Sequence, residues 1–198
     1  MKICREVKKN AGMTYVELIV VLSIFSVMTS VVLFNYNEFQ AKIDIKVLAN
    51  DIALKIVEAQ KSALSGKLPQ ICIDAPGDCV DWKPSYGIYF DLADNARFIY
   101  FANFDNNFYD SSPTDSILDR SFITKNNIIS GLEAVGVNCS TVTNLSIVFR
   151  RPDSGAIILD SNGGALCDNT EYVKITVSSP ELINATIEVY SSGRIQIN

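Results

Sequence analysis

A short basic segment followed by a long uncharged apolar run is the feature that most restricts what this chain can fold into. Residues 18–37 read LIVVLSIFSVMTSVVLFNYN and contain no charged side chain. As a helix rising about 1.5 Å per residue, such a run spans the ~30 Å hydrocarbon core of a bilayer. Residues 1–12 hold four cationic side chains and one acidic one, and cations beside a span stay in the cytoplasm. The pattern predicts one membrane-anchoring helix with its N-terminus in the cytoplasm.

The remainder of the chain is acidic. The formal net charge is −5, and residues 1–12 contribute +3, so residues 13–198 carry −8. Because phosphate binding needs clustered lysine and arginine, this charge argues against a general nucleic-acid surface. The chain has no histidine, which removes the commonest general base and metal ligand. It also lacks a phosphate-binding loop and a Gly-x-Ser-x-Gly motif, so we expect no enzymatic activity and no cofactor.

Glu17, at the edge of the apolar run, does not fit an ordinary signal sequence. A secretory signal peptide has a shorter apolar region that is followed by a small-residue cleavage site, whereas this run would suit an uncleaved anchor. A carboxylate inside the bilayer costs about 2.5–3.5 kcal/mol on insertion scales, so it is a candidate functional residue. The alternative is a carboxylate that reaches back to the membrane interface.

The segment KKNAG-MTYVELIVVLSIF resembles the type IV prepilin signature, which pilins share with the pseudopilins of type II secretion systems. The resemblance implies cleavage between Gly12 and Met13 by a membrane prepilin peptidase and N-methylation of Met13. It also implies that an assembly ATPase and a platform protein move the subunit from the cytoplasmic (inner) membrane into a periplasmic or extracellular filament. Two departures are Met13, where phenylalanine is frequent, and the lack of the helix-breaking proline of many major pilins.

Cleavage would expose a cationic amine four residues before Glu17. If subunits stack with an axial offset, the amine of one subunit can meet Glu17 of a neighbour. Paired charges cost far less in a low-dielectric environment than separated ones do. Glu17 is therefore predicted to set the register of assembly.

The helix is expected to continue past the membrane, from Thr14 to Ser65, over about 75–80 Å. Gly66 should cap it and Pro69 should prevent its continuation. Apolar residues recur at helical spacing on one face, which should pack against a globular head; they are Ile45, Leu48, Ile52, Ile56, Ala59 and Ala63. We divide the chain into a leader (1–12), a transmembrane half-helix (13–37), an amphipathic half-helix (38–66) and a β-rich head (67–198).

Beyond Pro69 the helical period gives way to short β-like runs between turn signals. We predict strands at Tyr86–Leu92, Ala96–Asn103, Ile128–Glu133, Leu145–Phe149, Ala156–Asp160, Tyr172–Val177, Ala185–Tyr190 and Arg194–Ile197. The fold class is α+β, a long transmembrane and amphipathic helix packed on an antiparallel β-sheet head, as in type IV pilins. The order YGIYF, a second aromatic strand, a variable loop, IVFRRPDSG and SSGRIQIN resembles the H-type minor pseudopilins and their fimbrial relatives (the GspH/FimT group). This second resemblance implies a minor subunit.

Four cysteines lie beyond the apolar run, and an even number of thiols in an exported domain favours disulfides. Cys72 and Cys79 are separated by six residues, which is not zinc-knuckle spacing, and are predicted to close a local loop. Cys139 and Cys167 would then join two later loops. Four cysteines allow three pairings, and the sequence does not choose among them.

Two further sites are candidates. Asp105, Asn107 and Asp110 offer oxygen ligands for Ca²⁺, although the EF-hand pattern is incomplete and such residues are ordinary turn formers. In the FimT-like branch that takes up DNA, a C-terminal Gly-Arg-x-Arg carries the contact, and here Arg194 is present without the second arginine. A DNA-uptake minor pilin and an anchored β domain that never assembles are the two alternative functions.

Overall fold

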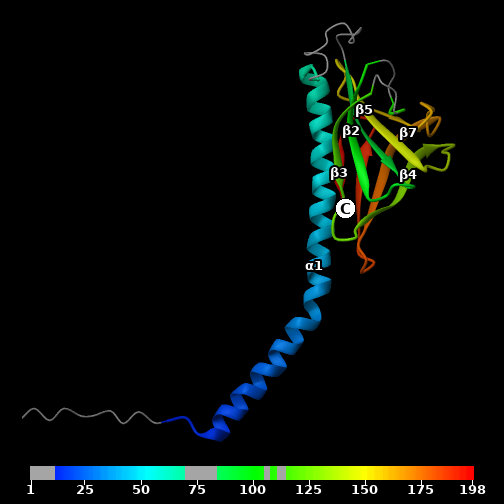
Figure 1. Cartoon of the computed structure of the whole chain (residues 1–198). Helices are drawn as coiled ribbons and strands as arrows, with labels where there is room; N and C mark the ends of the chain where they lie inside the picture. Colours follow the sequence, from blue (N-terminus) through cyan, green and yellow to red (C-terminus); the bar gives the residue numbers. More distant parts are fainter. Residues whose placement is uncertain (1–11, 70–83, 105–107, 111–114) are drawn as a thin grey trace, which may run out of the picture. The chain divides into compact units, whose positions relative to one another are not determined.

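The computed structural model describes residues 12–69, 84–104, 108–110 and 115–198. Within these residues it contains one helix, α1 (Tyr15–Ser65, 51 residues), followed by nine strands (Figure 1). Both ends of α1 agree with the predicted helix to within one residue. The chain divides into two compact units, residues 1–40 and 41–198, so the second part of α1 belongs to the same unit as the strands.

The C-terminal end of α1 is closed by a glycine, as predicted. Gly66 has a left-handed φ of 62°, and its N–H donates to the carbonyl of Ala63 at 3.1 Å. The N–H of Lys67 donates to the carbonyl of Ser62 at 3.2 Å. This pair of bonds is the Schellman motif, which favours glycine because a side chain is strained at that φ. The motif ends the helix where the chain turns toward the strands.

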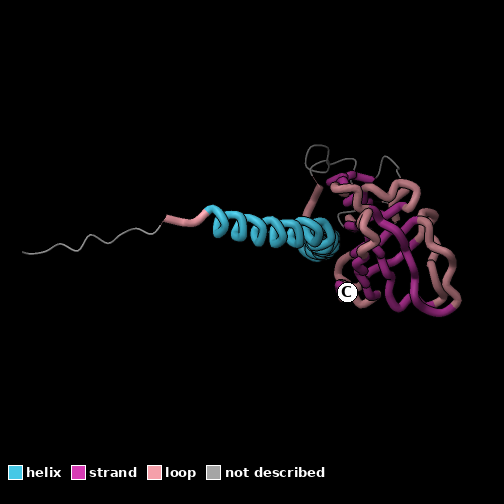
Figure 2. Tube along the Cα trace, turned by 90° about the horizontal axis from the view of Figure 1, so that it is seen from below, coloured by secondary structure: helices cyan, strands magenta, loops and turns pink. Residues whose placement is uncertain are grey.

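The head contains two antiparallel sheets, where the sequence predicted one. The five-stranded sheet has the order β3-β2-β1-β5-β6, and the four-stranded sheet has the order β4-β7-β8-β9. The first is formed by β1 (Ser85–Asp91), β2 (Arg97–Asn103), β3 (Asp115–Phe122), β5 (Asn144–Phe149) and β6 (Ala156–Leu159). The second is formed by β4 (Ile128–Val137), β7 (Asn169–Ser178), β8 (Asn184–Tyr190) and β9 (Ile195–Ile197). Figure 2 shows these strands gathered into one body with loops at its edge.

Residues 41–65 of α1 and both sheets share one hydrophobic core. The buried face of α1 is formed by Ile45, Ala49, Ile52, Ile56, Ala59 and Ala63. It packs with alternate residues of the strands, such as Ile88 of β1 and Ile175 of β7. The predicted apolar face is therefore confirmed, except that Leu48 is only partly buried.

Polar contacts fix the rotation of α1 against the head. On one side, Lys55 pairs with Asp119 of β3 at 3.0 Å, and Lys125 pairs with Asp44 at 2.5 Å. On the other side, Gln60 Nε2 donates to the carbonyl of Ser154 at 2.9 Å. Because α1 is held from both sides, the face opposite the core points away from the head.

The strand β3 was not predicted; its sequence was assigned to a variable loop. DSILDRSF has no regular alternation of apolar and polar residues, which is the usual signal for a strand. The strand forms because it pairs with β2, from Arg97↔Phe122 to Asn103↔Asp115, with an irregularity between Tyr100 and Phe101. The eight predicted strands are all present, and β4 and β7 are longer than predicted because they pair with each other along their length.

Candidate functional site

The processing and assembly residues lie at the start of α1. Gly12 and Met13 are exposed and precede the helix, and Thr14 comes immediately before its first residue. The backbone N–H of Glu17 donates to Thr14 Oγ1 at 3.3 Å, which is an N-cap interaction. Thr14 thus fixes where the helix begins, and the sequence analysis missed this role. The available signal was the Thr-x-x-Glu spacing of a capping box.

The position of Glu17 in the first turn gives it a modest local stabilisation. A carboxylate near the positive end of a helix dipole is stabilised by about 0.3–1 kcal/mol. Placing a charge within a bilayer costs about 2.5–3.5 kcal/mol. A deficit of roughly 2 kcal/mol remains, so the helix start alone does not offset a membrane location of Glu17.

The first part of α1 presents an exposed apolar surface. Every side chain described from Tyr15 to Phe34 is exposed, and most are apolar. By length and composition, α1 can cross a membrane once, and it is the one helix of the described ranges that can. An apolar surface of this length needs lipid or other protein around it.

A second apolar line runs along α1 within the head unit, on the face away from the core. We call Ile43, Val47 and Leu54 the crest; their exposed fractions are 41%, 51% and 65%. At about 100° per residue they lie about 160°, 200° and 180° around the helix from the buried Ile45. Polar residues normally occupy the outer face of a helix that packs on a soluble domain, so the crest is the unusual feature of this segment.

A groove lies beside the crest, between α1 and the edge strand β3. It consists of two cavities of about 320 and 120 Å³, both lined by Leu48, Asp51 and Phe122. Phe122 ends β3 and is 69% exposed. The groove was not foreseen because its β3 wall was not predicted.

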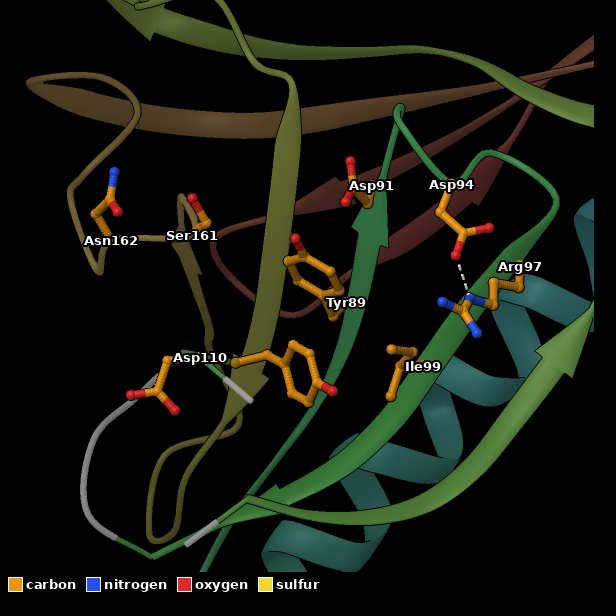
Figure 3. Close-up of a pocket in the computed structure, with 9 residues that line it drawn as sticks. Tyr89, Asp91, Asp94, Arg97, Ile99, Asp110, Ser161 and Asn162 are labelled. Atoms are coloured by element: carbon orange, nitrogen blue, oxygen red, sulfur yellow. Dashed lines mark ion pairs between the residues drawn. The ribbon is translucent and has the colours of Figure 1, made fainter. Parts of the chain in front are cut away.

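Another hollow, of about 430 Å³, lies on the outer face of the five-stranded sheet (Figure 3). Its lining consists of Tyr89, Asp91, Asp94, Arg97, Ile99, Tyr109, Asp110, Ser161 and Asn162. The rings of Tyr89 and Tyr109 lie 4.9 Å apart, and Arg97 forms an ion pair with Asp94. Burial, and then the nearby charge of Asp91, raise the pKa of Tyr89 to about 12, so the phenol stays protonated at neutral pH. We assign no ligand to this hollow because nothing in its lining selects one.

The calcium prediction gains no support from the described residues. Asp105 and Asn107 lie outside them. Asp110 is described, but no group of three acidic or thiol side chains able to hold a metal occurs in the described part of the chain. The backbone N–H of Asp110 instead donates to Asp115 Oδ2 at 2.9 Å. Asp115 Oδ1 accepts from Asn103 Nδ2 at 2.7 Å, so Asp115 acts as a structural acceptor at the start of β3.

Asp115 should make the stability of the head depend on pH. Burial, despite the bond from the Asp110 backbone, raises the pKa of Asp115 to about 6, above the ordinary value of about 3.9. The folded state then holds its proton more tightly than the unfolded state does. The stabilisation is fully present below about pH 4 and is lost as the pH rises through 6. Over this range the free energy of unfolding should fall with pH at well under the one-proton limit of about 1.4 kcal/mol per pH unit.

We expect Asp115→Asn to flatten that part of the stability curve. The measurement is urea unfolding of residues 41–198 between pH 4 and 7, in a chelating buffer so that calcium plays no part. The matched control is Asp160→Asn, a carboxylate in the turn after β6. An unchanged slope in Asp115→Asn would show that another group titrates there.

Two of the four candidate disulfide cysteines are described, and they are bonded to each other: Cys139 with Cys167. Val137 of β4 is the partner of Asn169 of β7, so the disulfide continues the antiparallel register two residues further along each chain segment. Between this last strand pair and the disulfide, Asn138 Nδ2 donates to Asp168 Oδ2 at 2.7 Å. Cys72 and Cys79 lie outside the described residues, and their pairing stays a prediction.

Arg194, the candidate DNA contact, lies against an aromatic column on the outer face of the four-stranded sheet. Its guanidinium carbon is 3.9 Å from the centroid of the Tyr190 ring, and Tyr190 lies 5.1 Å from Tyr172. The neighbouring strand positions carry Glu188 and, on β7, its partner Lys174, so on β7 and β8 a carboxylate accompanies the one lysine. The arrangement accounts for Arg194 as a cation–π partner of Tyr190.

Comparison of the chain with protein-family models, curated proteins and solved structures gave no match in any of the three. The functional interpretation therefore depends on the residues and geometry described above.

Proposed function

We propose that this chain is the precursor of a minor pilin or pseudopilin, a structural subunit of a type IV pilus or type II secretion pseudopilus. In this proposal residues 1–12 stay in the cytoplasm, prepilin peptidase cuts after Gly12, and Met13 becomes the N-methylated first residue. The partners are prepilin peptidase, the assembly ATPase and platform protein, and other subunits contacted through α1.

The observation that carries this proposal is the exposed crest of α1. An anchored domain that never assembles needs an apolar surface only where it meets lipid, that is, along residues 18–37. The crest lies beyond that run, on a helix that already buries its opposite face in the core. An apolar line on both faces of one helix is typical of a helix that packs between protein surfaces. The crest therefore favours a subunit that assembles through α1.

The decisive experiment is the mass of the N-terminal peptide of the mature protein. We expect a peptide that begins at Met13 and carries one methyl group on its amine. A protein that keeps residues 1–12 would be an uncleaved anchor, and the proposal would be abandoned. For the DNA-uptake alternative, the test is DNA binding by the head with and without Arg194→Ala; we expect no binding in either case.

Glu17→Ala should leave insertion and cleavage intact but reduce incorporation into filaments several-fold. The substitution retains the backbone N–H that Thr14 caps, so α1 should still begin at Tyr15. It removes the carboxylate that would offset the amine of a neighbouring subunit. Glu17→Asp keeps the charge with a shorter reach, and we expect an intermediate result. The measurement is the ratio of processed subunit in sheared filaments to that in the membrane.

The matched control is Glu38→Ala, a carboxylate of the same helix beyond the apolar run. Water and salt screen a charge there, so its loss should change the ratio little. If Glu17→Ala and wild type give the same ratio, Glu17 does not set the register, although the cleavage assignment would stand.

A further inference from the structure

The exposed arc of α1 in the head unit is electrically asymmetric. Between residues 41 and 65 the acidic residues are Asp44, Asp51 and Glu58, spaced seven apart. Relative to Ile45 they lie about 260°, 240° and 220° around the helix, on the side of the crest that faces β3. This acidic flank borders the groove, since Asp51 and Glu58 line one of its cavities together with Phe122.

The opposite side of the crest is basic. Lys46 and Lys61 lie about 100° and 160° from Ile45, and both are exposed. Leu64, 43% exposed, lies at about 100° on the same side. No acidic residue of this helical segment falls on this basic flank.

The two flanks differ in net charge. On the acidic side, Lys55 is shared between Glu58 at 3.2 Å and Asp119 at 3.0 Å, and Asp44 pairs with Lys125. The carboxylates of Asp44, Asp51, Glu58 and Asp119 and the ammonium groups of Lys55 and Lys125 together give the acidic flank a net charge of −2. Lys46 and Lys61 give the basic flank +2. The flanks of one molecule are therefore complementary to each other, and neither is complementary to itself.

We infer that the groove between α1 and β3 receives the basic flank of α1 from a second copy of this chain. The contact rests on the proposed function, since it names the surface through which the subunits associate. Two acidic or two basic flanks would repel, so the contact pairs an acidic flank with a basic one.

The apolar surface and the charges have different roles in this contact. Exposed ion pairs are individually weak, so the four charges do not supply most of the affinity. The groove walls, Leu48 and Phe122, and the crest residue Leu54 supply apolar area, and aromatic residues of this kind often dominate interfaces. The charges select the orientation, because they determine which flank meets the groove.

A photo-crosslinking amino acid in place of Phe122 tests the contact directly. Benzoylphenylalanine preserves the aromatic ring at an exposed position, in the full-length protein reconstituted in lipid vesicles. We expect a crosslinked dimer whose second peptide comes from residues 41–65 of the other copy. A crosslink from groove to groove, or no dimer, would overturn the inference.

Charge reversal tests the pairing of an acidic flank with a basic one. The double variants Lys46→Glu/Lys61→Glu and Asp51→Lys/Glu58→Lys should each reduce crosslinking at position 122 about tenfold, which corresponds to 1.4 kcal/mol. Mixing the two variants should restore it, since each then offers a flank that the other attracts. The control Glu171→Lys/Glu181→Lys reverses two exposed carboxylates on and after β7 and should crosslink like the parent protein.

Failure of the mixture to recover would disprove the contact, provided that both variants melt like the parent protein. That outcome would leave the proposed function unaffected, because a separate measurement, the N-terminal mass of the mature protein, tests that function. An unprocessed N-terminus with normal crosslinking would instead remove the filament role and leave the contact.

Discussion

Replacing Gly12 by leucine should abolish maturation, leaving the full-length precursor in the membrane. The prepilin resemblance places the cut after Gly12, and a peptidase subsite that accepts glycine has little room for a branched side chain. The fold should not respond, because a Cβ at Gly12 would meet no atom within 4 Å. Any loss of processing would then report on the peptidase and not on a misfolded substrate. The measurement is the electrophoretic ratio of precursor to mature protein in cells that contain the peptidase.

Gly12→Ala provides a graded control, since one methyl group adds far less bulk than leucine does. We expect Gly12→Ala to be cleaved more slowly than the parent protein and Gly12→Leu not to be cleaved. A normal amount of mature protein in the leucine variant would show that cleavage occurs elsewhere or not at all.

Removing the disulfide with Cys139→Ser/Cys167→Ser should lower the free energy of unfolding of the head by about 3–4 kcal/mol. The bridge has a sequence separation of 28 residues, and the loop-closure entropy lost in the unfolded chain for such a loop has about that size at 25 °C. Since a whole domain is stable by only about 5–15 kcal/mol, this would be a large fraction of the total. The measurement is urea unfolding of residues 41–198, the compact unit that contains the bridge.

The position of the bridge sharpens this expectation. It lies two residues beyond the last β4–β7 pair in the same register, so its loss should fray that end of the ladder before the core. Amide exchange at Val137 and Asn169 should therefore accelerate more than exchange at Leu132 and Ile175, which pair in the middle of the same strands. Equal acceleration along the ladder would mean that the bridge acts only by restricting the unfolded chain and not by holding this end of the ladder together. An unchanged free energy of unfolding would contradict the expected contribution of the bridge.

The sequence alone determined α1 almost completely, because the determinants of a helix are local. The uncharged run, the apolar residues spaced three and four apart, and Gly66 with Pro69 all act within a few residues of themselves. Most strands were found for the same reason: alternation and turn residues are also local signals. The motif around Gly12 and Glu17 could be recognised from the sequence because its residues lie within one short segment.

Only the tertiary structure decided the features that depend on distant partners. The strand β3 exists through its pairing with β2. The two sheets separate because β4 pairs with β7, with 31 residues of chain between Val137 and Asn169, and leaves β5 and β6 in the other sheet. The same pairing places Cys167 beside Cys139, which decides their disulfide partnership. Likewise, the three acids spaced seven apart on α1 are visible in the sequence, but they become the border of a groove only where β3 and Phe122 lie beside them. Helix periodicity defines which residues share a face; long-range packing decides which face is buried, and that choice left the crest and its two charged flanks exposed.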